Sequence, residues 1–330
     1  MGDVAMLVPV IHSLANQHSD LHVTLLTRKN FEALFDWMPK NVEVIGVNPK
    51  DYAGITGLTR LYRELRARKF DCMADMHDVL RSKYLRTRFR LSGVKCAKID
   101  KGRKEKKKLL GHGNGHQPLK PMVNRYVEVL ETLGLDVTLD FNCLFNKSME
   151  SLASVEAIVG DKQVGERWVG IAPFAAHDNK IYPLDKMRQM LNSLSESGCR
   201  VFLFGAGKKE KELLEGWESD HVESICGKME SLHDEILLMS MLDVMVAMDS
   251  ANMHIASLVG VPVISVWGPT HPKAGFIPWN QPSENIIQVD DLPCRPCSVY
   301  GNKPCRFDDL RCMNRISPET IINKVKQITG

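Results

Sequence analysis

The sequence predicts an α/β protein with two doubly wound domains, each built on a parallel sheet that helices cover on both faces. Apolar runs rich in β-branched residues alternate with helical patterns along the chain, which is typical of parallel sheets. The alternation occurs twice, on either side of a less patterned stretch at 146–167. A length of 330 residues, with 44% hydrophobic and 25% charged residues, is typical of a globular chain of two domains.

Nine strands are expected from the apolar runs. In the first half they lie at His22–Thr27, Val42–Val47, Phe70–Asp75 and Val94–Ile99. In the second half they lie at Trp168–Pro173, Arg200–Phe204, Val222–Ile225, Val244–Met248 and Val261–Trp267. The clearest helices are expected at Met6–Ala15, Leu184–Ser195, Lys208–Trp217, Leu232–Met241 and Asn252–Leu258. This order predicts two Rossmann-like domains, 1–155 and 156–330, that face each other.

Both ends of the chain carry a prediction. Gly2-Asp3-Val4 has the pattern of a loop that leads into the first helix, whereas a parallel α/β domain normally opens with a strand. The first strand of the N-terminal domain is therefore expected to be missing; a domain that begins with a helix is the alternative. At the other end, Ser317 and Pro318 predict a capped helix at 317–329, which we expect to pack back on the N-terminal domain.

The charge is distributed unevenly. Residues 1–150 contain 25 Lys and Arg against 17 Asp and Glu, and residues 151–330 contain 18 against 23. The basic half indicates an anionic partner such as a phosphorylated glycolipid or a membrane surface; for the run Lys101–Lys108 alone, a solvated loop is the alternative. Nucleic acid is not expected, because few aromatic residues lie among the cations and no binding motif is present. No apolar stretch reaches the ~20 residues of a membrane span, and no signal peptide is recognised, so a cytoplasmic protein is expected.

The most informative segment runs from Asp249 to Pro272. Asp249 and Ser250 follow an apolar strand and stand where a helix begins; a Gly-Val-Pro turn, a second strand and a Gly-Pro loop come next. Free backbone N–H groups and the positive end of the helix dipole make such a start a binding site for a pyrophosphate. The alternative is that the two side chains only cap the helix.

This segment, with the sequence Asp-Ser-Ala-Asn-Met-His-Ile-Ala-Ser, resembles the donor-site signature of the ADP-heptose:lipopolysaccharide heptosyltransferases, which have the GT-B architecture of two Rossmann-like domains. Weaker matches to that family occur in the expected order at 2–4, 75–82, 172–183 and 204–210. The resemblance spans almost the whole chain. It implies an inverting glycosyltransferase that moves a heptose from ADP-heptose to the lipopolysaccharide inner core of a Gram-negative bacterium and needs no cofactor.

The resemblance also implies roles in the reaction. Asp3 is expected to be the base that takes the proton of the acceptor hydroxyl, and Lys180 is expected to stabilise the charge of the leaving diphosphate. The donor is expected to be bound by Lys180, Glu210, Met229, Asp249, Ser250, Ala251 and His254. Glu210 would accept hydrogen bonds from the ribose and Met229 would pack on the adenine. The alternatives are a helix cap for Asp3, a solvated loop lysine for Lys180, a helix charge for Glu210 and a core side chain for Met229.

The acceptor side is predicted from basic residues of the first domain. The candidates for contact with carboxylates and phosphates of the core are His77, Arg81, Arg103 and Lys104, with further cations between 101 and 108 and at Arg125. His77 is equally compatible with a plain strand end. An enzyme with this acceptor is expected to contact the inner face of the cytoplasmic membrane.

Other readings of the same fold remain open at this point. A GT-B transferase or epimerase that uses a UDP- or GDP-sugar would keep the architecture and change the donor. A truncated or inactive paralogue would keep the fold without the activity.

Four of the nine cysteines are clustered near the C-terminus. Cys294, Cys297, Cys305 and Cys312 lie within nineteen residues and are candidates for a structural zinc site. Free thiols are the first alternative, since the spacing of the last two is looser than in common zinc motifs. A disulfide is the second, although a reducing cytosol disfavours it.

Overall fold

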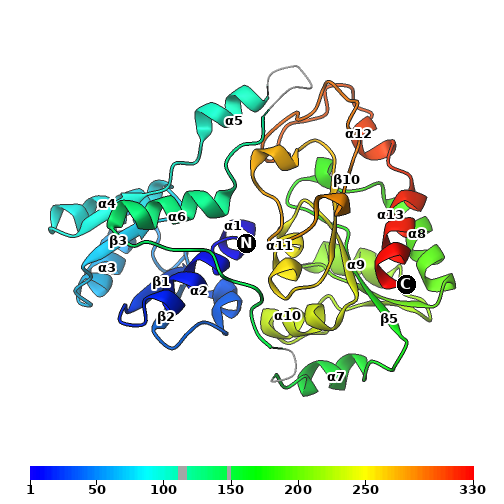
Figure 1. Cartoon of the computed structure of the whole chain (residues 1–330), viewed down its shortest axis with the longest axis horizontal. Coiled ribbons are helices and arrows are strands. Elements are labelled where there is room, and N and C mark those ends of the chain that lie inside the picture. Colours follow the sequence, from blue (N-terminus) through cyan, green and yellow to red (C-terminus); the bar gives the residue numbers. More distant parts are fainter. Residues whose placement is uncertain (111–116, 147–149) are drawn as a thin grey trace. The chain divides into compact units, whose positions relative to one another are not determined.

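The computed structural model describes residues 1–110, 117–146 and 150–330 (Figure 1). These residues group into two compact units, which are described separately. Unit 1 contains Met1–Ala5, Lys104–Leu119 and Asn142–Gly330, and unit 2 contains Met6–Arg103 and Lys120–Phe141. The expected domain boundary between residues 155 and 156 stays a prediction.

Unit 1 is built on a parallel sheet of six strands in the order β10-β9-β8-β5-β6-β7. The strands are β5 (Arg167–Ala172), β6 (Cys199–Leu203), β7 (Val222–Ser224), β8 (Val244–Met248), β9 (Val263–Trp267) and β10 (Ile286–Gln288). The chain runs outward from β5 to β7, returns to β8 on the other side of β5, and then continues to β10. The strand order therefore reverses between β5 and β8, and ligands of doubly wound sheets bind at the carboxyl ends of the strands at such a switch point.

The helices of unit 1 pack against its sheet and against one another. They are α1 (Gly2–Ala5), α7 (Ala153–Val159), α8 (Leu184–Glu196), α9 (Lys208–Glu215), α10 (Leu232–Met241), α11 (Ala251–Leu258), α12 (Arg311–Asn314) and α13 (Pro318–Thr329), and α5 (Arg103–Leu109) begins at the boundary between the units. Helix α13 starts at the predicted cap, where the Ser317 hydroxyl accepts a hydrogen bond from the Thr320 backbone N–H at 3.3 Å. It packs beside α8 in the core of unit 1 (Figure 1). Contact of this helix with the N-terminal domain stays a prediction.

Unit 2 contains two parallel strand pairs and four α-helices among its described residues. The pairs are β1 (Val23–Arg28) with β2 (Val42–Val47), and β3 (Cys72–Asp75) with β4 (Lys95–Lys98). The helices are α2 (Val8–Gln17), α3 (Gly54–Arg66), α4 (Leu80–Leu91) and α6 (Met122–Leu133), with the 3-10 helix η1 (Lys29–Phe35) after β1. A separate hydrophobic cluster joins α3 to α4, and in it the rings of Tyr62 and Phe89 meet edge to face at 5.1 Å.

The predicted α/β architecture with parallel strands is confirmed. All nine expected strands are present, with ends that differ by a few residues. The sequence missed β10, because a strand of three residues shows too little periodicity to be recognised. Within the part of the chain that the structure describes, no helix combines the length and the apolar character needed to cross a membrane.

Candidate functional site

Three loops at the carboxyl edge of the unit 1 sheet bring Lys180, Asp249 and Thr270 together. Lys180 follows β5, Asp249 follows β8 and Thr270 follows β9. Oδ2 of Asp249 accepts hydrogen bonds from Lys180 Nζ at 3.0 Å and from the Thr270 hydroxyl at 2.8 Å. All three residues are buried. The predicted donor lysine is therefore not a solvated loop lysine, and it stands at the switch point of the sheet.

The segment after β10 holds these loops in place. Arg295 donates hydrogen bonds to the backbone oxygens of Trp267 and Thr270, at 3.2 and 3.0 Å, and so fixes the loop after β9. Gly301 lies so close to Lys180 that a Cβ atom added there would overlap Cγ and Cδ of the lysine side chain. The φ of Gly301 is +80°, a left-handed conformation that favours glycine. This support was not predicted: both residues lie within the cysteine cluster, but nothing in the sequence places that segment against the loops after β5 and β9.

Gly301→Ala is expected to displace Lys180 and to weaken binding of ADP by at least about tenfold, as measured by calorimetric titration. Gly165→Ala is the matched control, since Gly165 has a φ of +86° and an added Cβ would meet no atom within 4 Å. Both variants carry the backbone strain of alanine at positive φ, and only one carries the clash. Equal ADP affinities of the two variants would contradict the role of Gly301.

The N-terminus of α11 lies beside the ion pair. Ser250 is the N-cap residue and Ala251 is the first helical residue. The Ser250 hydroxyl makes no capping hydrogen bond, and it is buried without any hydrogen-bond partner among the described residues. Nδ1 of His254, one turn further along α11, is also buried without a partner there. Buried polar atoms are normally hydrogen-bonded, so these two atoms leave hydrogen-bonding capacity unused near the N-terminus of α11.

Burial lowers the pKa of His254 to about 4, although the nearby charges of Asp249 and Asp3 act to raise it. The imidazole is therefore neutral at pH 7 and acts as a hydrogen-bonding group rather than as a cation. Helix α1 packs on α11, and an added Cβ atom at Gly2 would stand 3.3 Å from Cδ2 of His254. This contact brings Asp3, which is exposed, to the same end of α11.

The other two predicted donor residues follow the neighbouring strands β6 and β7. Glu210, in the first turn of α9, accepts a hydrogen bond at 2.8 Å from the Ala206 backbone N–H and so closes the glycine-containing loop after β6. Met229 follows β7 and is buried, with 8% of its surface exposed. Both residues lie at the same edge of the sheet as Lys180. Their contacts with ribose and adenine stay predictions.

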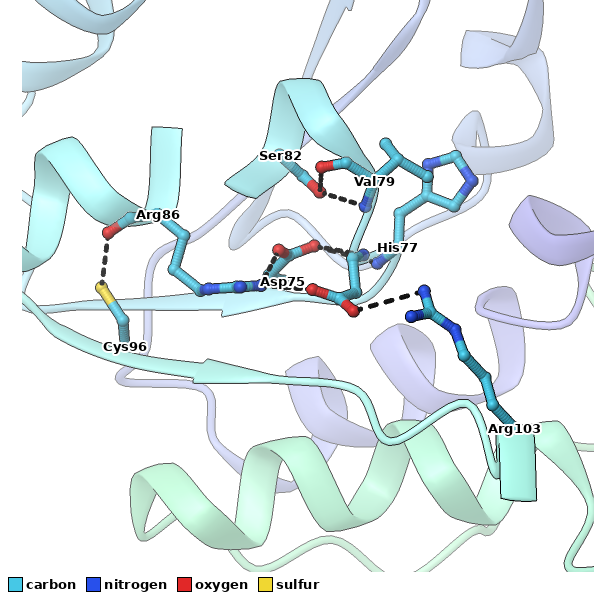
Figure 2. Close-up of polar contacts among 8 residues, drawn as sticks. Asp75, His77, Val79, Ser82, Arg86, Cys96 and Arg103 are labelled. Atoms are coloured by element: carbon cyan, nitrogen blue, oxygen red, sulfur yellow. Dashed lines mark hydrogen bonds and ion pairs between the residues drawn. The ribbon is translucent and has the colours of Figure 1, made fainter. Parts of the chain in front are cut away.

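In unit 2, the strand end at Asp75 carries a compact ionic network (Figure 2). Arg86 of α4 forms ion pairs with Asp75 and, at 3.0 Å, with Asp78. Both carboxylates are buried, and Asp75 also accepts the backbone N–H groups of His77 and Asp78. Burial acts to raise the pKa of Asp78, but the Arg86 hydrogen bond and neighbouring lysines outweigh it, so this pKa lies below its usual value. Asp78 has a φ of +43°, an uncommon conformation that the network holds.

Three of the four predicted acceptor residues, His77, Arg81 and Arg103, belong to the same unit as this network. Nη2 of Arg103 lies 3.6 Å from Oδ2 of Asp78. His77 lies in the loop after β3, and Arg81 is in the first turn of α4; both are exposed. Lys104 is exposed on α5 and belongs to unit 1. Sequence analysis missed Arg86, because nothing in the pattern distinguishes it from the other cations of α4.

The four clustered cysteines lie in and after the segment that carries Arg295. All of them have free thiols, and Cys312 is buried, which raises the pKa of its thiol to about 11. Among the residues that the structure describes, no group of three or more His, Cys, Asp or Glu side chains is arranged to hold a metal ion. The structural zinc site stays a prediction, which metal analysis of the purified protein tests.

Known proteins resemble this chain in both sequence and fold. Residues 58–306 match the model of glycosyltransferase family 9 (heptosyltransferase). Lipopolysaccharide heptosyltransferase 3 of Escherichia coli K12 is 24% identical over 318 residues, which cover 87% of this chain and 84% of that protein. Lipooligosaccharide heptosyltransferase 2 of Campylobacter jejuni (strain 81116) is 25% identical over 174 residues; the match covers 50% of this chain and 52% of that protein, about half the length of each.

The fold has a solved counterpart. The structure of E. coli ADP-heptose LPS heptosyltransferase II superimposes with a TM-score of 0.72 at 16% identity, covering 99% of this chain and 95% of that one. The likeness confirms the predicted GT-B fold class. The family model matches well over half of the chain, from the middle of unit 2 to the cysteine-containing segment of unit 1. The chain belongs to glycosyltransferase family 9, the heptosyltransferase family.

Proposed function

We propose that this protein transfers a heptose from ADP-heptose to the inner core of lipopolysaccharide, with inversion at the anomeric carbon. The observation that carries the proposal is the buried Lys180–Asp249 pair beside the N-terminus of α11, where Ser250 Oγ and His254 Nδ1 lack partners. A lysine, a helix start and two unsatisfied polar atoms together suit a diphosphate. Family membership supports the choice of a heptose donor.

The proposed reaction is a single displacement. Asp3 takes the proton of the acceptor hydroxyl while that oxygen attacks the anomeric carbon, and the bond to the diphosphate breaks. Negative charge then grows on the leaving ADP, where Lys180, the α11 backbone N–H groups and neutral His254 stabilise it. Glu210 and Met229 hold the ribose and adenine. These groups supply the chemistry without a required cofactor.

We also propose where the protein acts. Its acceptor is the anionic core of a lipid-anchored glycan in a Gram-negative bacterium, so the enzyme works in the cytoplasm at the inner face of the cytoplasmic membrane. The exposed cations of unit 2 around Asp78 support an anionic acceptor. Arg81, Arg103, Lys104 and His77 are the proposed contacts.

Calorimetric titration with ADP, UDP, GDP and CMP tests the donor site. We expect selective binding of ADP, and Lys180→Ala should weaken binding of ADP far more than binding of adenosine, because only ADP carries the diphosphate. Lys326→Ala, on the exposed side of α13, is the matched control and should bind both as the unsubstituted protein does. Preferred binding of UDP or GDP would move the function to another sugar donor, as a transferase or an epimerase. Absence of any nucleotide binding would identify an inactive paralogue.

A further inference from the structure

One side of helix α4 in unit 2 carries a stripe of four side chains with an exposed leucine at each end. At 3.6 residues per turn, its positions 80, 84, 87 and 91 fall on one line along the helix. Leu80 and Leu91 mark the two ends of the line, about 16 Å apart by the helical rise, and their exposed fractions are 85% and 81%. Among the described residues of unit 2, the exposed large hydrophobic side chains are these two leucines and Ile55.

The opposite side of α4 is fixed in the core. Leu85 and Phe89 are buried in the cluster shared with α3, so the helix cannot turn its stripe inward without losing that packing. Ile55 extends the apolar surface from the first turn of α3, where it is 74% exposed. One turn further along α3, the hydroxyl of Thr59 forms a hydrogen bond with the hydroxyl of Tyr84, with 2.7 Å between the two oxygen atoms. The exposed leucines and Ile55 thus lie on two helices that are tied together.

Cations flank the stripe on both sides, and α4 contains no acidic residue. Arg81 and Arg88 stand on one flank, and Lys83 and Arg90 stand on the other. The remaining cation of α4, Arg86, points to the buried carboxylates and is neutralised there (Figure 2). We call the whole surface the α4 face; it consists of Ile55, Leu80, Arg81, Lys83, Tyr84, Thr87, Arg88, Arg90 and Leu91.

We propose that the α4 face docks this protein on an anionic lipid bilayer. Leucine and isoleucine side chains enter the region below the headgroups, and the flanking arginines and lysine reach the lipid phosphates with their long side chains. A nucleic acid would use the cations but gain nothing from the leucines, so the combination favours a lipid surface. The inference deepens the proposed function, since the acceptor proposed there is anchored in a membrane, but vesicle binding is measurable without any sugar transfer.

Sedimentation of the full chain with vesicles tests the proposal. We expect binding to vesicles of phosphatidylglycerol and phosphatidylethanolamine, at least about tenfold weaker binding to phosphatidylcholine, and weakening as salt increases. Leu80→Ser with Leu91→Ser should reduce the affinity about a hundredfold, about tenfold for each leucine removed from the lipid. Arg88→Gln with Arg90→Gln should also reduce the affinity for anionic vesicles and should make that affinity less dependent on salt.

Matched controls come from exposed residues of unit 1. Val164→Ser removes a fully exposed apolar side chain, and Lys208→Gln with Lys326→Gln removes two exposed cations; both should bind vesicles as the unsubstituted protein does. All of these positions are exposed, so thermal midpoints should stay close to that of the unsubstituted protein. The arginine variant should fall slightly more, because Arg88 also lies over the Tyr62 ring, 4.8 Å from its centroid. Equal losses in the controls, unchanged binding after the two leucine substitutions, or no binding to anionic vesicles would each overturn the proposal.

The vesicle result and the proposed reaction can fail independently. Leu80→Ser with Leu91→Ser should leave transfer to a delipidated, water-soluble core acceptor at its original rate, while transfer to acceptor in vesicles should fall. Vesicle binding by a chain that moves no sugar would refute only the proposed function. Transfer to both acceptors at unchanged rates in the leucine variant would refute only the docking surface.

Discussion

Replacing Asp3 by asparagine is expected to lower the rate of heptose transfer by about 10²–10⁴-fold, the range that general-base catalysis supplies. Asparagine has the shape of aspartate and cannot take the proton of the acceptor hydroxyl. Asp3 is exposed on α1, and α1 packs on α11 beside His254, so the substitution leaves the donor groups in place. The rate is measured as formation of the extended core oligosaccharide at saturating donor.

ADP affinity separates loss of the base from loss of the site. Calorimetric titration of the Asp3→Asn variant should give a dissociation constant within about twofold of the original, since the diphosphate contacts remain. Asp20→Asn, at an exposed turn, is the control and should keep the original rate. A variant without Asp3 that transfers heptose at the normal rate would remove this residue as the base.

Arg86→Met is expected to destabilise the protein by about 3–5 kcal/mol, because it leaves the buried carboxylates of Asp75 and Asp78 without their guanidinium. The measurement is the free energy of unfolding in urea, followed by a probe of unit 2. Arg90→Met, on the exposed side of the same helix, is the control and should change the free energy of unfolding by no more than about 0.5 kcal/mol.

A second substitution shows whether the loss comes from the unpaired charge. Adding Asp75→Asn to Arg86→Met removes one of the stranded carboxylates and should restore part of the stability. Equal stability of the Arg86→Met and Arg90→Met variants would show that the ion pairs of Arg86 do not stabilise the end of β3. The positive φ of Asp78 would then not be explained by these ion pairs.

Much of the fold was predictable because local pattern and tertiary structure agree. Strands such as Val244–Met248 are fully buried, and a continuous apolar run is what a strand buried on both faces requires. The gathering of the candidate donor residues was predictable for a related reason: Asp249 and Ser250 directly follow β8, Lys180 lies in the loop after β5, and parallel strands bring such positions to one edge. The pairing of the four first-half strands into two separate ladders was not visible in their sequences.

The parts that sequence analysis missed depend on side-chain direction or on distant segments. Arg86 is one of five cations on α4. It is the one that pairs with Asp75 because of the direction in which its side chain leaves the helix, and the sequence does not give that direction. Gly301 lies against Lys180 from more than a hundred residues further along the chain, and Arg295 fixes the loop that carries Thr270; both lie in a segment with little periodicity. Thr270 lies inside the Asp249–Pro272 segment. Its hydrogen bond to Asp249 depends on how the loops after β8 and β9 are placed in three dimensions, which the sequence does not show.

The ion pair between Lys180 and Asp249 has a consequence for the end of each catalytic cycle. A buried ammonium that relied on nucleotide phosphates alone would be stranded whenever the nucleotide departed, at a cost of several kcal/mol. Here Asp249 is a resident counter-ion, and it keeps the empty site balanced. A nucleotide diphosphate must compete with that carboxylate for the lysine, both when the donor arrives and when the product leaves.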